Sequence, residues 1–169
     1  MYLEFIQQFD KSLGNLDAIL SKAENHAAAK KFNPDNYLQL RLAPDMLPLV
    51  VQVRIACDNA KGITALLAGK DAPKHEDNET TFADLHGRIA KCRTYLQSFK
   101  AEDFAHNTAQ TKVKLAYPPN KLMYAPEAVI SRYVPNFYFH IVTTYAILRA
   151  GGVELGKSDY LGELNLLDP

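Results

Sequence analysis

Apolar residues recur at alternating spacings of three and four along much of this chain, and this spacing limits the fold more than any other feature. It is clearest after Thr80 and Thr81, either of which can cap a helix that has Asp84 in its first turn. The apolar residues of this stretch are Phe82, Leu85, Ile89, Cys92, Leu96 and Phe99. Because an α-helix turns about once every 3.6 residues, they form one stripe. The stretch is therefore predicted to be a helix with one buried side.

Two earlier stretches follow the same rule. Residues 2–29 form the first predicted helix, which Asn33 and Pro34 bring to an end. Its stripe consists of Ile6, Phe9, Leu13, Leu16 and Leu20. A second helix is predicted from Pro44 or Asp45 to Gly69, since Pro and Asp suit a helix entrance and Gly suits a helix exit. Its apolar line comprises Met46, Leu49, Val50, Val53, Cys57, Ala60 and Leu67.

The last predicted helix covers residues 130–150, and a pair of glycines at 151 and 152 ends it. Its inward residues are predicted to be Val134, Phe137, Ile141, Thr144 or Tyr145, and Leu148. Pro135 leaves two alternatives open at its start, because proline disrupts a helix interior but fits a first turn. Either the helix begins at Pro135, or an earlier turn in residues 125–131 precedes a kink.

The connection between the last two helices changes character. Residues 111–117 alternate polar and apolar side chains, which is typical of a strand, and Pro118, Pro119 and Asn120 form a turn signal. Residues 121–125 can return as a second strand, so a short β-hairpin is predicted over 111–125. Four helices of about 18–25 residues with long connections predict an all-α, antiparallel four-helix bundle. Residues 1–169 suit one such domain.

The charge balance narrows the classes of partner. Lys plus Arg and Asp plus Glu are both 19, which argues against a protein that binds nucleic acid by neutralising phosphates. No apolar run approaches the ~18–20 residues that span a bilayer, and Glu4 and Asp10 make the N-terminus unlike a signal peptide. Cys57 and Cys92 each lie in an apolar helical pattern, as expected for free core cysteines in a reducing cytoplasm.

The common catalytic signatures are missing from the sequence. It contains no GxGxxG, P-loop, GxSxG or HExxH pattern, and no two of its five histidines lie three or four residues apart. A metal site would therefore have to be assembled from different helices.

His140 is the most informative histidine because of its helical neighbours. Asn136 lies one turn before it and Thr144 one turn after it, so the three form a polar stripe beside the apolar face. On the second helix, Gln52 directly precedes the core residue Val53 and can flank the same interior. One interpretation is a buried hydrogen-bonded network that fixes the helix register. The other is a pocket in which His140 acts as a ligand or an acid–base group, with surrounding aromatics as its walls.

Three segments resemble a known family. They are RLAPDMLPLVVQVRIACDNAKG at 41–62, ETTFADLHGRIAKC at 79–92 and PNFYFHIVTTYAILRAGGVELGKSDYLG at 135–162. They resemble an uncharacterised family of bacterial and fungal proteins within the DinB/YfiT-like superfamily. The resemblance implies an antiparallel four-helix bundle, often a homodimer. It also implies a divalent metal, zinc or nickel, held by one histidine of the second helix and an HxxxH pair of the last.

Carried onto this sequence, the resemblance places His140 at the second histidine of that pair. Asn136 then takes the position of the first histidine, and Gln52 that of the histidine on the second helix. Two of the three expected ligands are thus amides, which zinc and nickel bind less well than imidazole. The sequence therefore predicts a degenerate metal site at His140, Asn136 and Gln52.

Two functions follow from these expectations. The first is a cytoplasmic dimer that binds a small ligand or acts as an accessory protein, for example in a stress response. The alternative is a divalent-metal-dependent hydrolase or thiol transferase that uses His140, and the sequence leaves open whether the protein is an enzyme.

Overall fold

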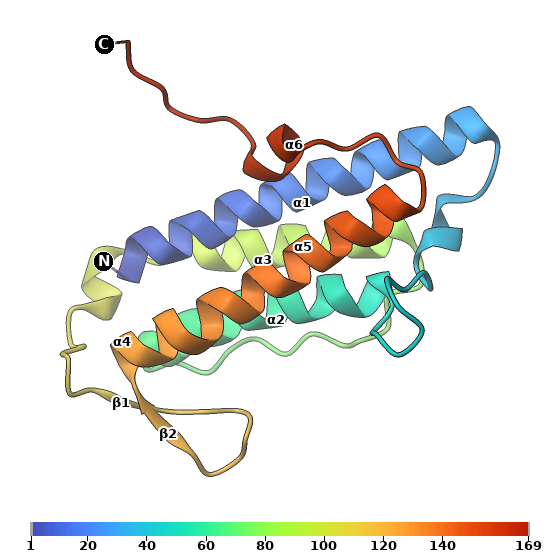
Figure 1. Ribbon diagram of the computed structural model, residues 1–169. Coiled ribbons are helices and arrows are strands. Elements are labelled where there is room, and N and C mark those ends of the chain that lie inside the picture. Colours follow the sequence, from blue (N-terminus) through green and yellow to red (C-terminus); the bar gives the residue numbers. More distant parts are fainter. Residues whose placement is uncertain (1, 169) are drawn as a thin grey trace.

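The computed structural model describes residues 2–168, in which four long helices form a bundle (Figure 1). They are α1 (Tyr2–Lys30), α2 (Leu49–Leu67), α3 (Phe82–Gln97) and α5 (Val134–Ala150). Thr81 caps α3 by accepting a hydrogen bond from the Asp84 backbone N–H, while the Asp84 carboxylate accepts one from Thr81 N–H. The predicted helical bundle and the predicted cap of its third helix are both confirmed.

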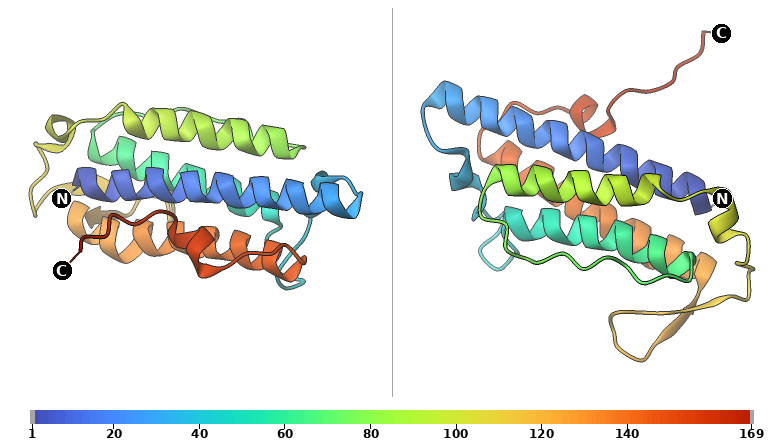
Figure 2. Two further views of the ribbon diagram at one scale, coloured as in Figure 1. Left: turned by 90° about the horizontal axis from the view of Figure 1, so that it is seen from above. Right: turned by 180° about the vertical axis from the view of Figure 1, so that it is seen from behind.

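The connection between α2 and α3 determines which helices run parallel and which run antiparallel. Residues 68–81 cross back along the bundle, so α2 and α3 run parallel to each other, while α3 is antiparallel to α1 and α5 is antiparallel to α2 (Figure 2). Side-chain contacts agree with this arrangement. On α3, Arg93 bonds Asp10 near the start of α1, and His86, one to two turns earlier, bonds Asp17 further along α1.

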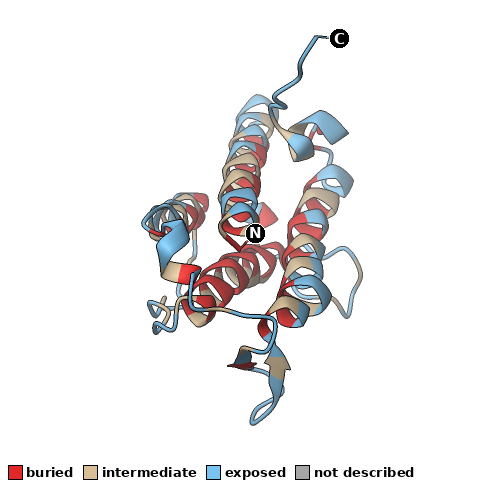
Figure 3. Ribbon diagram, turned by 90° about the vertical axis from the view of Figure 1, so that its left-hand side faces the viewer, coloured by how far each residue is buried: buried red, intermediate tan, exposed pale blue. Residues whose placement is uncertain are grey.

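The core lies where the four apolar stripes meet, and Figure 3 shows the buried residues on the inner sides of the helices. All six residues of the predicted α3 stripe and all five of the α1 stripe are buried. Phe9 of α1 and Phe137 of α5 have ring centroids 4.4 Å apart. Cys57 and Cys92 are free and buried, and the Cys92 thiol donates to the Cys57 carbonyl oxygen over 3.4 Å.

Helix α2 begins later than its sequence predicts. The helix starts at Leu49 instead of Pro44 or Asp45, and Pro48 is its N-cap, with extended φ and ψ of −72° and 164°. Proline disfavours the helical conformation of the residue before it, so Leu47 stays outside the helix. Residues 41–48 form a loop, and Met46, which was predicted to be in the core, is only half-buried.

A hairpin and a π-helix connect α3 to α5. Strands β1 (Lys112–Lys114) and β2 (Leu122–Tyr124) are antiparallel, with Val113 opposite Met123, which confirms the predicted hairpin. A short helix α4 (Ala125–Glu127) and a π-helical turn η3 (Ala128–Tyr133) then lead into α5. The smaller elements are the 3₁₀ turns η1 (Pro34–Tyr37) and η2 (Ala101–Phe104) and helix α6 (Lys157–Leu161).

The π-helical turn decides between the two alternatives at Pro135. The helix starts before the proline, and the widened turn precedes it. Pro135 has no N–H to offer the Ser131 carbonyl, and its ring would collide with that carbonyl in a regular α-helix. A wider turn relieves this collision, and such turns are frequent at functional sites.

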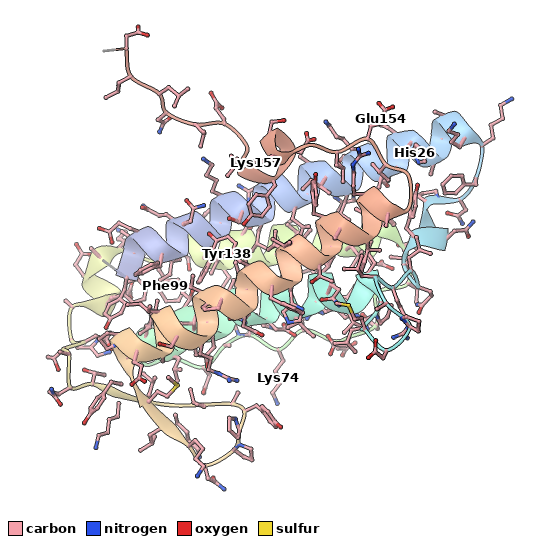
Figure 4. The ribbon with its side chains drawn as sticks, viewed as in Figure 1. His26, Lys74, Phe99, Tyr138, Glu154 and Lys157 are labelled. Carbon is pink, nitrogen blue, oxygen red and sulfur yellow. The ribbon has the colours of Figure 1, made fainter. Side chains whose placement is uncertain are left out.

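The segment after α5 packs along α1 only as far as α6. Val153 and Leu155 are buried, and the Asn15 side chain donates a hydrogen bond to the Tyr160 carbonyl oxygen. Tyr138 of α5 faces α1 next to this segment, within 3.4 Å of the Ser12 hydroxyl (Figure 4). Leu164, Leu166 and Leu167, which follow α6, are exposed. None of the described helices is long and apolar enough to cross a membrane.

Candidate functional site

His140 and Gln52 meet between α5 and α2, as their sequence positions predict. His140 Nδ1 lies 2.7 Å from Gln52 Oε1, and Gln52 Nε2 donates to the Leu47 carbonyl oxygen over 2.9 Å. Both side chains are buried, with Gln52 only 1% exposed. Because α2 begins only at Leu49, Leu47 lies in the loop just before Pro48, and its carbonyl oxygen accepts this hydrogen bond from outside the helix.

The hydrogen bonds fix which imidazole nitrogen of His140 carries the proton. A carbonyl oxygen only accepts, so Leu47 holds the amide nitrogen of Gln52 and turns its oxygen toward His140. Nδ1 of His140 therefore donates, which leaves the lone pair on Nε2. Burial lowers the pKa of His140 below its ordinary value, so the ring is neutral at pH 7.

Asn136 does not join this pair. Its side chain is exposed, and in residues 2–168 it makes no hydrogen bond to His140 or Gln52. Thr144 is buried, but its hydroxyl donates to the His140 carbonyl oxygen of the same helix. The structure thus brings together two of the three residues predicted for a metal site and turns the third toward a neighbouring cavity.

The three side chains do not fit zinc or nickel as a ligand set. The Gln52 oxygen already accepts the His140 proton, and Asn136 lies apart from both. Within the described part of the chain, no group of three or more His, Cys, Asp or Glu side chains is arranged to hold a metal ion. A degenerate metal site stays a prediction, and no chemistry is derived through a metal.

The cavity that Asn136 lines has a volume of about 420 Å³, which is within the range of small-molecule sites. It lies between α2, the start of the 68–81 connection, the hairpin and η3. Its apolar wall includes Ile55, Leu66 and Ala116, and its polar residues include Asp58, Asn59, Lys70, Asp71, Lys114, Arg132, Tyr133 and Asn136.

Two residues that line this cavity each have one buried polar atom without a hydrogen-bond partner among the described residues. These atoms are Oδ1 of Asn59 on α2 and Nε of Arg132 in η3. Asn59 is only 7% exposed. Leaving such an atom unpaired costs about 1–3 kcal/mol, so native proteins rarely keep one without a reason. Two of them, one acceptor and one donor, belong to residues that line the same cavity.

Some charged residues around the cavity have ion-pair partners, and others have none among the described residues. Asp58 pairs with Lys61 and Arg88, and Lys70 pairs with Asp103. Arg132 and Lys114 form no ion pair with any of residues 2–168, although Arg132 lies over the Tyr133 ring at 5.7 Å. Asp71 is likewise unpaired within that range. The cavity lining therefore contains two cations, Arg132 and Lys114, and one anion, Asp71, that have no ion-pair partner within residues 2–168.

The fold is that of a DinB-like helical bundle. The chain is 47% identical to a DinB family member protein from Shewanella denitrificans, whose crystal structure matches with a TM-score of 0.91. The match covers 97% of this chain and 93% of that one. The comparison with curated proteins returned no match. Residues 1–161 match a family model described as a domain of unknown function, DUF1993, and the chain belongs to that family.

Sequence reasoning found His140, Gln52 and Asn136 but missed Asn59 and Arg132. Asn59 was visible as a polar residue directly before Ala60 in the apolar line of α2. Arg132 precedes Pro135 by three residues, where the proline forces a widened turn. Both residues line one cavity although 73 positions separate them, from 59 to 132. This depends on where the hairpin and η3 pack, which local patterns do not determine.

Proposed function

We propose that this protein binds a small molecule in the cavity between α2, η3 and the hairpin, as an accessory protein without a metal centre. The observation that carries the proposal is the cavity of about 420 Å³, which places Arg132 and Lys114, two cations without an ion-pair partner in residues 2–168, beside an apolar wall. A small molecule of this size can contact the apolar wall and the charged groups of the cavity together.

In this proposal His140 has a structural role. Its Nδ1–H and the Gln52 amide satisfy each other between α5 and α2, and the Leu47 carbonyl completes the chain of hydrogen bonds. Such a network fixes the register of two packed helices without any catalytic purpose. It occupies the place where the resemblance puts a metal, so we propose that the metal site is degenerate. The alternative, a metal-dependent enzyme, would require ligands beyond these three residues.

We further propose that the protein is a homodimer that pairs through the outer face of α5. An apolar line runs along this face at Pro135, Phe139, Val142, Ala146 and Ala150, and Phe139 and Val142 are 55% and 46% exposed. The line is nearly symmetric about Val142. An antiparallel second copy would therefore place Phe139 opposite the small Ala146, as an isologous two-fold interface requires.

Two matched glycine variants test the binding proposal. A Cβ added at Gly62, which lines the cavity, or at Gly87, which lies on α3 outside it, meets no atom within 4 Å. Gly62→Leu should fill the cavity, whereas Gly87→Leu makes the same change in another helix. A thermal-shift screen of metabolite-sized compounds should give hits with wild type and Gly87→Leu that Gly62→Leu loses. Hits that are insensitive to Gly62→Leu would contradict the proposal, as would the absence of hits.

A further inference from the structure

The β-hairpin carries a charge that the rest of the chain does not share. Residues 104–126, which include both strands, contain three lysines, Lys112, Lys114 and Lys121, and no Asp, Glu or Arg. None of the three forms an ion pair with any of residues 2–168. The whole chain balances 19 basic against 19 acidic side chains, so the other 146 residues hold 16 basic and 19 acidic ones. The hairpin segment therefore has a formal charge of +3 and the remainder a charge of −3.

Two of these lysines share one face of the hairpin with apolar residues. The register pairs Lys112 with Tyr124 and Lys114 with Leu122. Residues directly opposite each other on antiparallel strands lie on the same face, and successive residues of a strand point to opposite faces. Val113, which lies between the two lysines, is buried in the core. The outer face of the hairpin thus presents cations from β1 and apolar side chains from β2.

The apolar side chains of this outer face lie in solvent. Leu122 is 60% exposed and Tyr124 is 42% exposed, and Tyr117 at the turn is 72% exposed. A sheet face that contacts water is normally polar, so these residues indicate a binding surface. Lys112 Nζ lies 5.8 Å from the centroid of the Tyr124 ring, which places charge and apolar surface side by side. The hairpin projects from the bundle with its turn at the far end (Figures 1 and 2).

We propose that the hairpin docks on the surface of an anionic phospholipid bilayer. Anionic headgroups attract the unpaired lysines, and tyrosine and leucine side chains enter the layer between the headgroups and the acyl chains. A bilayer fits better than an acidic protein segment, because it surrounds a projecting tip and so contacts both the turn and the outer face. The docking is separate from the proposed small-molecule site, since Lys112, Leu122 and Tyr124 do not line that cavity.

Vesicle sedimentation tests this proposal with the full chain. Vesicles of phosphatidylcholine and phosphatidylserine in equal parts should carry wild-type protein into the pellet. Vesicles of phosphatidylcholine alone should bind at least about tenfold more weakly, because they lack the negative charge that attracts the lysines. Added salt should weaken binding to the mixed vesicles, since it screens the same attraction.

Two double variants show whether the lysines of the hairpin are responsible. Each lysine near an anionic surface strengthens binding about fivefold, so Lys112→Gln with Lys121→Gln should weaken it about 25-fold. Lys30→Gln with Lys31→Gln makes the same change of charge at the end of α1, which lies at the opposite end of the bundle (Figure 1). This control should bind the mixed vesicles like wild type.

A second matched pair tests the apolar contact. Leu122→Gln should weaken binding to the mixed vesicles at least about fourfold, the effect of one buried CH₂ group. Leu166→Gln changes a leucine that is 82% exposed near the end of the chain and should have no effect. All four side chains of the hairpin and control variants at positions 112, 121, 122 and 166 are exposed, so the melting temperature should stay at the wild-type value.

Three results would overturn the proposal. They are equal binding to the two kinds of vesicle, equal loss in the two lysine double variants, and wild-type protein that stays in solution with both kinds of vesicle. Poly-L-glutamate serves as a competing probe in the same assay. If it binds the hairpin lysines while the mixed vesicles do not, the surface belongs to an acidic protein and the bilayer proposal fails.

Discussion

His140 on α5 and Gln52 on α2 share a hydrogen bond of 2.7 Å across 88 positions of sequence. The bond is buried, and it joins two helices that pack along most of their lengths. Gln52 is itself held by the Leu47 carbonyl, so the histidine, the amide and the loop before α2 form one connected unit. We propose that this hydrogen-bonded unit takes the place of the metal centre that the family resemblance suggests.

Breaking one side of this hydrogen bond should destabilise the protein. We expect His140→Leu and Gln52→Leu each to lower the free energy of unfolding by about 1–3 kcal/mol, because each leaves a buried polar partner unpaired. The double variant should cost less than the sum, since it removes both partners. Urea denaturation of all four proteins measures this coupling. Stoichiometric zinc or nickel in untagged wild-type protein, absent from His140→Leu, would instead support a metal site.

Arg88 should be the most sensitive charged residue of the bundle. Its side chain is 2% exposed and bonds Asp58 of α2 and Asp77 and Glu79 of the 68–81 connection. Burial tends to raise the pKa of Glu79, but the hydrogen bonds from Arg88 and Arg54 outweigh it and lower that pKa.

Arg88→Met would leave these carboxylates without their shared cation and release the crossover connection. We expect a loss of about 3 kcal/mol, as for other broken buried ion pairs, and faster proteolytic cleavage within residues 70–80. Lys74→Met serves as the control on the same connection. Equal stability of the two variants would show that the Arg88 cluster does not hold the connection in place.

His86 should make stability depend on pH. It lies between Asp17 at 2.6 Å and Glu24 at 3.1 Å on α1. Burial lowers its pKa, but the hydrogen bonds and charges of the two carboxylates outweigh burial, and the pKa is raised. Because the folded pKa lies above the unfolded value of about 6.5, this contribution is complete below that value. It is lost as pH rises through the folded pKa.

His86→Gln removes this titration and leaves that of His140, whose lowered pKa acts in the opposite direction. The difference in unfolding free energy between wild type and His86→Gln should therefore be larger at about pH 5.5 than at about pH 8.5. Chemical denaturation at both values measures it. A difference that is constant or grows with pH would contradict the assigned pKa shift.

Phe139 should control the oligomeric state. Its side chain is the largest in the outer apolar line of α5. Phe139→Glu would therefore place a charge against the second copy of the chain. Light scattering after size exclusion should give a dimer for wild type and a monomer for the variant. Ile130→Glu changes an equally exposed apolar residue outside this line and should stay dimeric. A monomeric wild type at micromolar concentration would end the dimer proposal.

The sequence predicted those parts of the fold that depend on local periodicity. The stripe from Phe82 to Phe99 was correct at every position, because the spacing of a helix face is encoded within the helix itself. The start of α2 was wrong, because Pro48 constrains Leu47 more strongly than the apolar line extends the helix.

The parallel run of α2 and α3 could not be predicted, since a polar connection such as residues 70–80 carries no signal for its direction. The candidate site was likewise predicted only in part. His140 and Gln52 were placed together because both flank predicted core residues. The cavity was missed because its lining residues come together only through the packing of the hairpin and the π-helical turn.

A crystal structure of the protein soaked with a compound that Gly62→Leu fails to bind tests the central claim most directly. We predict electron density for the compound between α2 and η3, in contact with Arg132 and the apolar wall of the cavity. Density elsewhere, for example beside His140, or a cavity without density for the compound, would contradict the account.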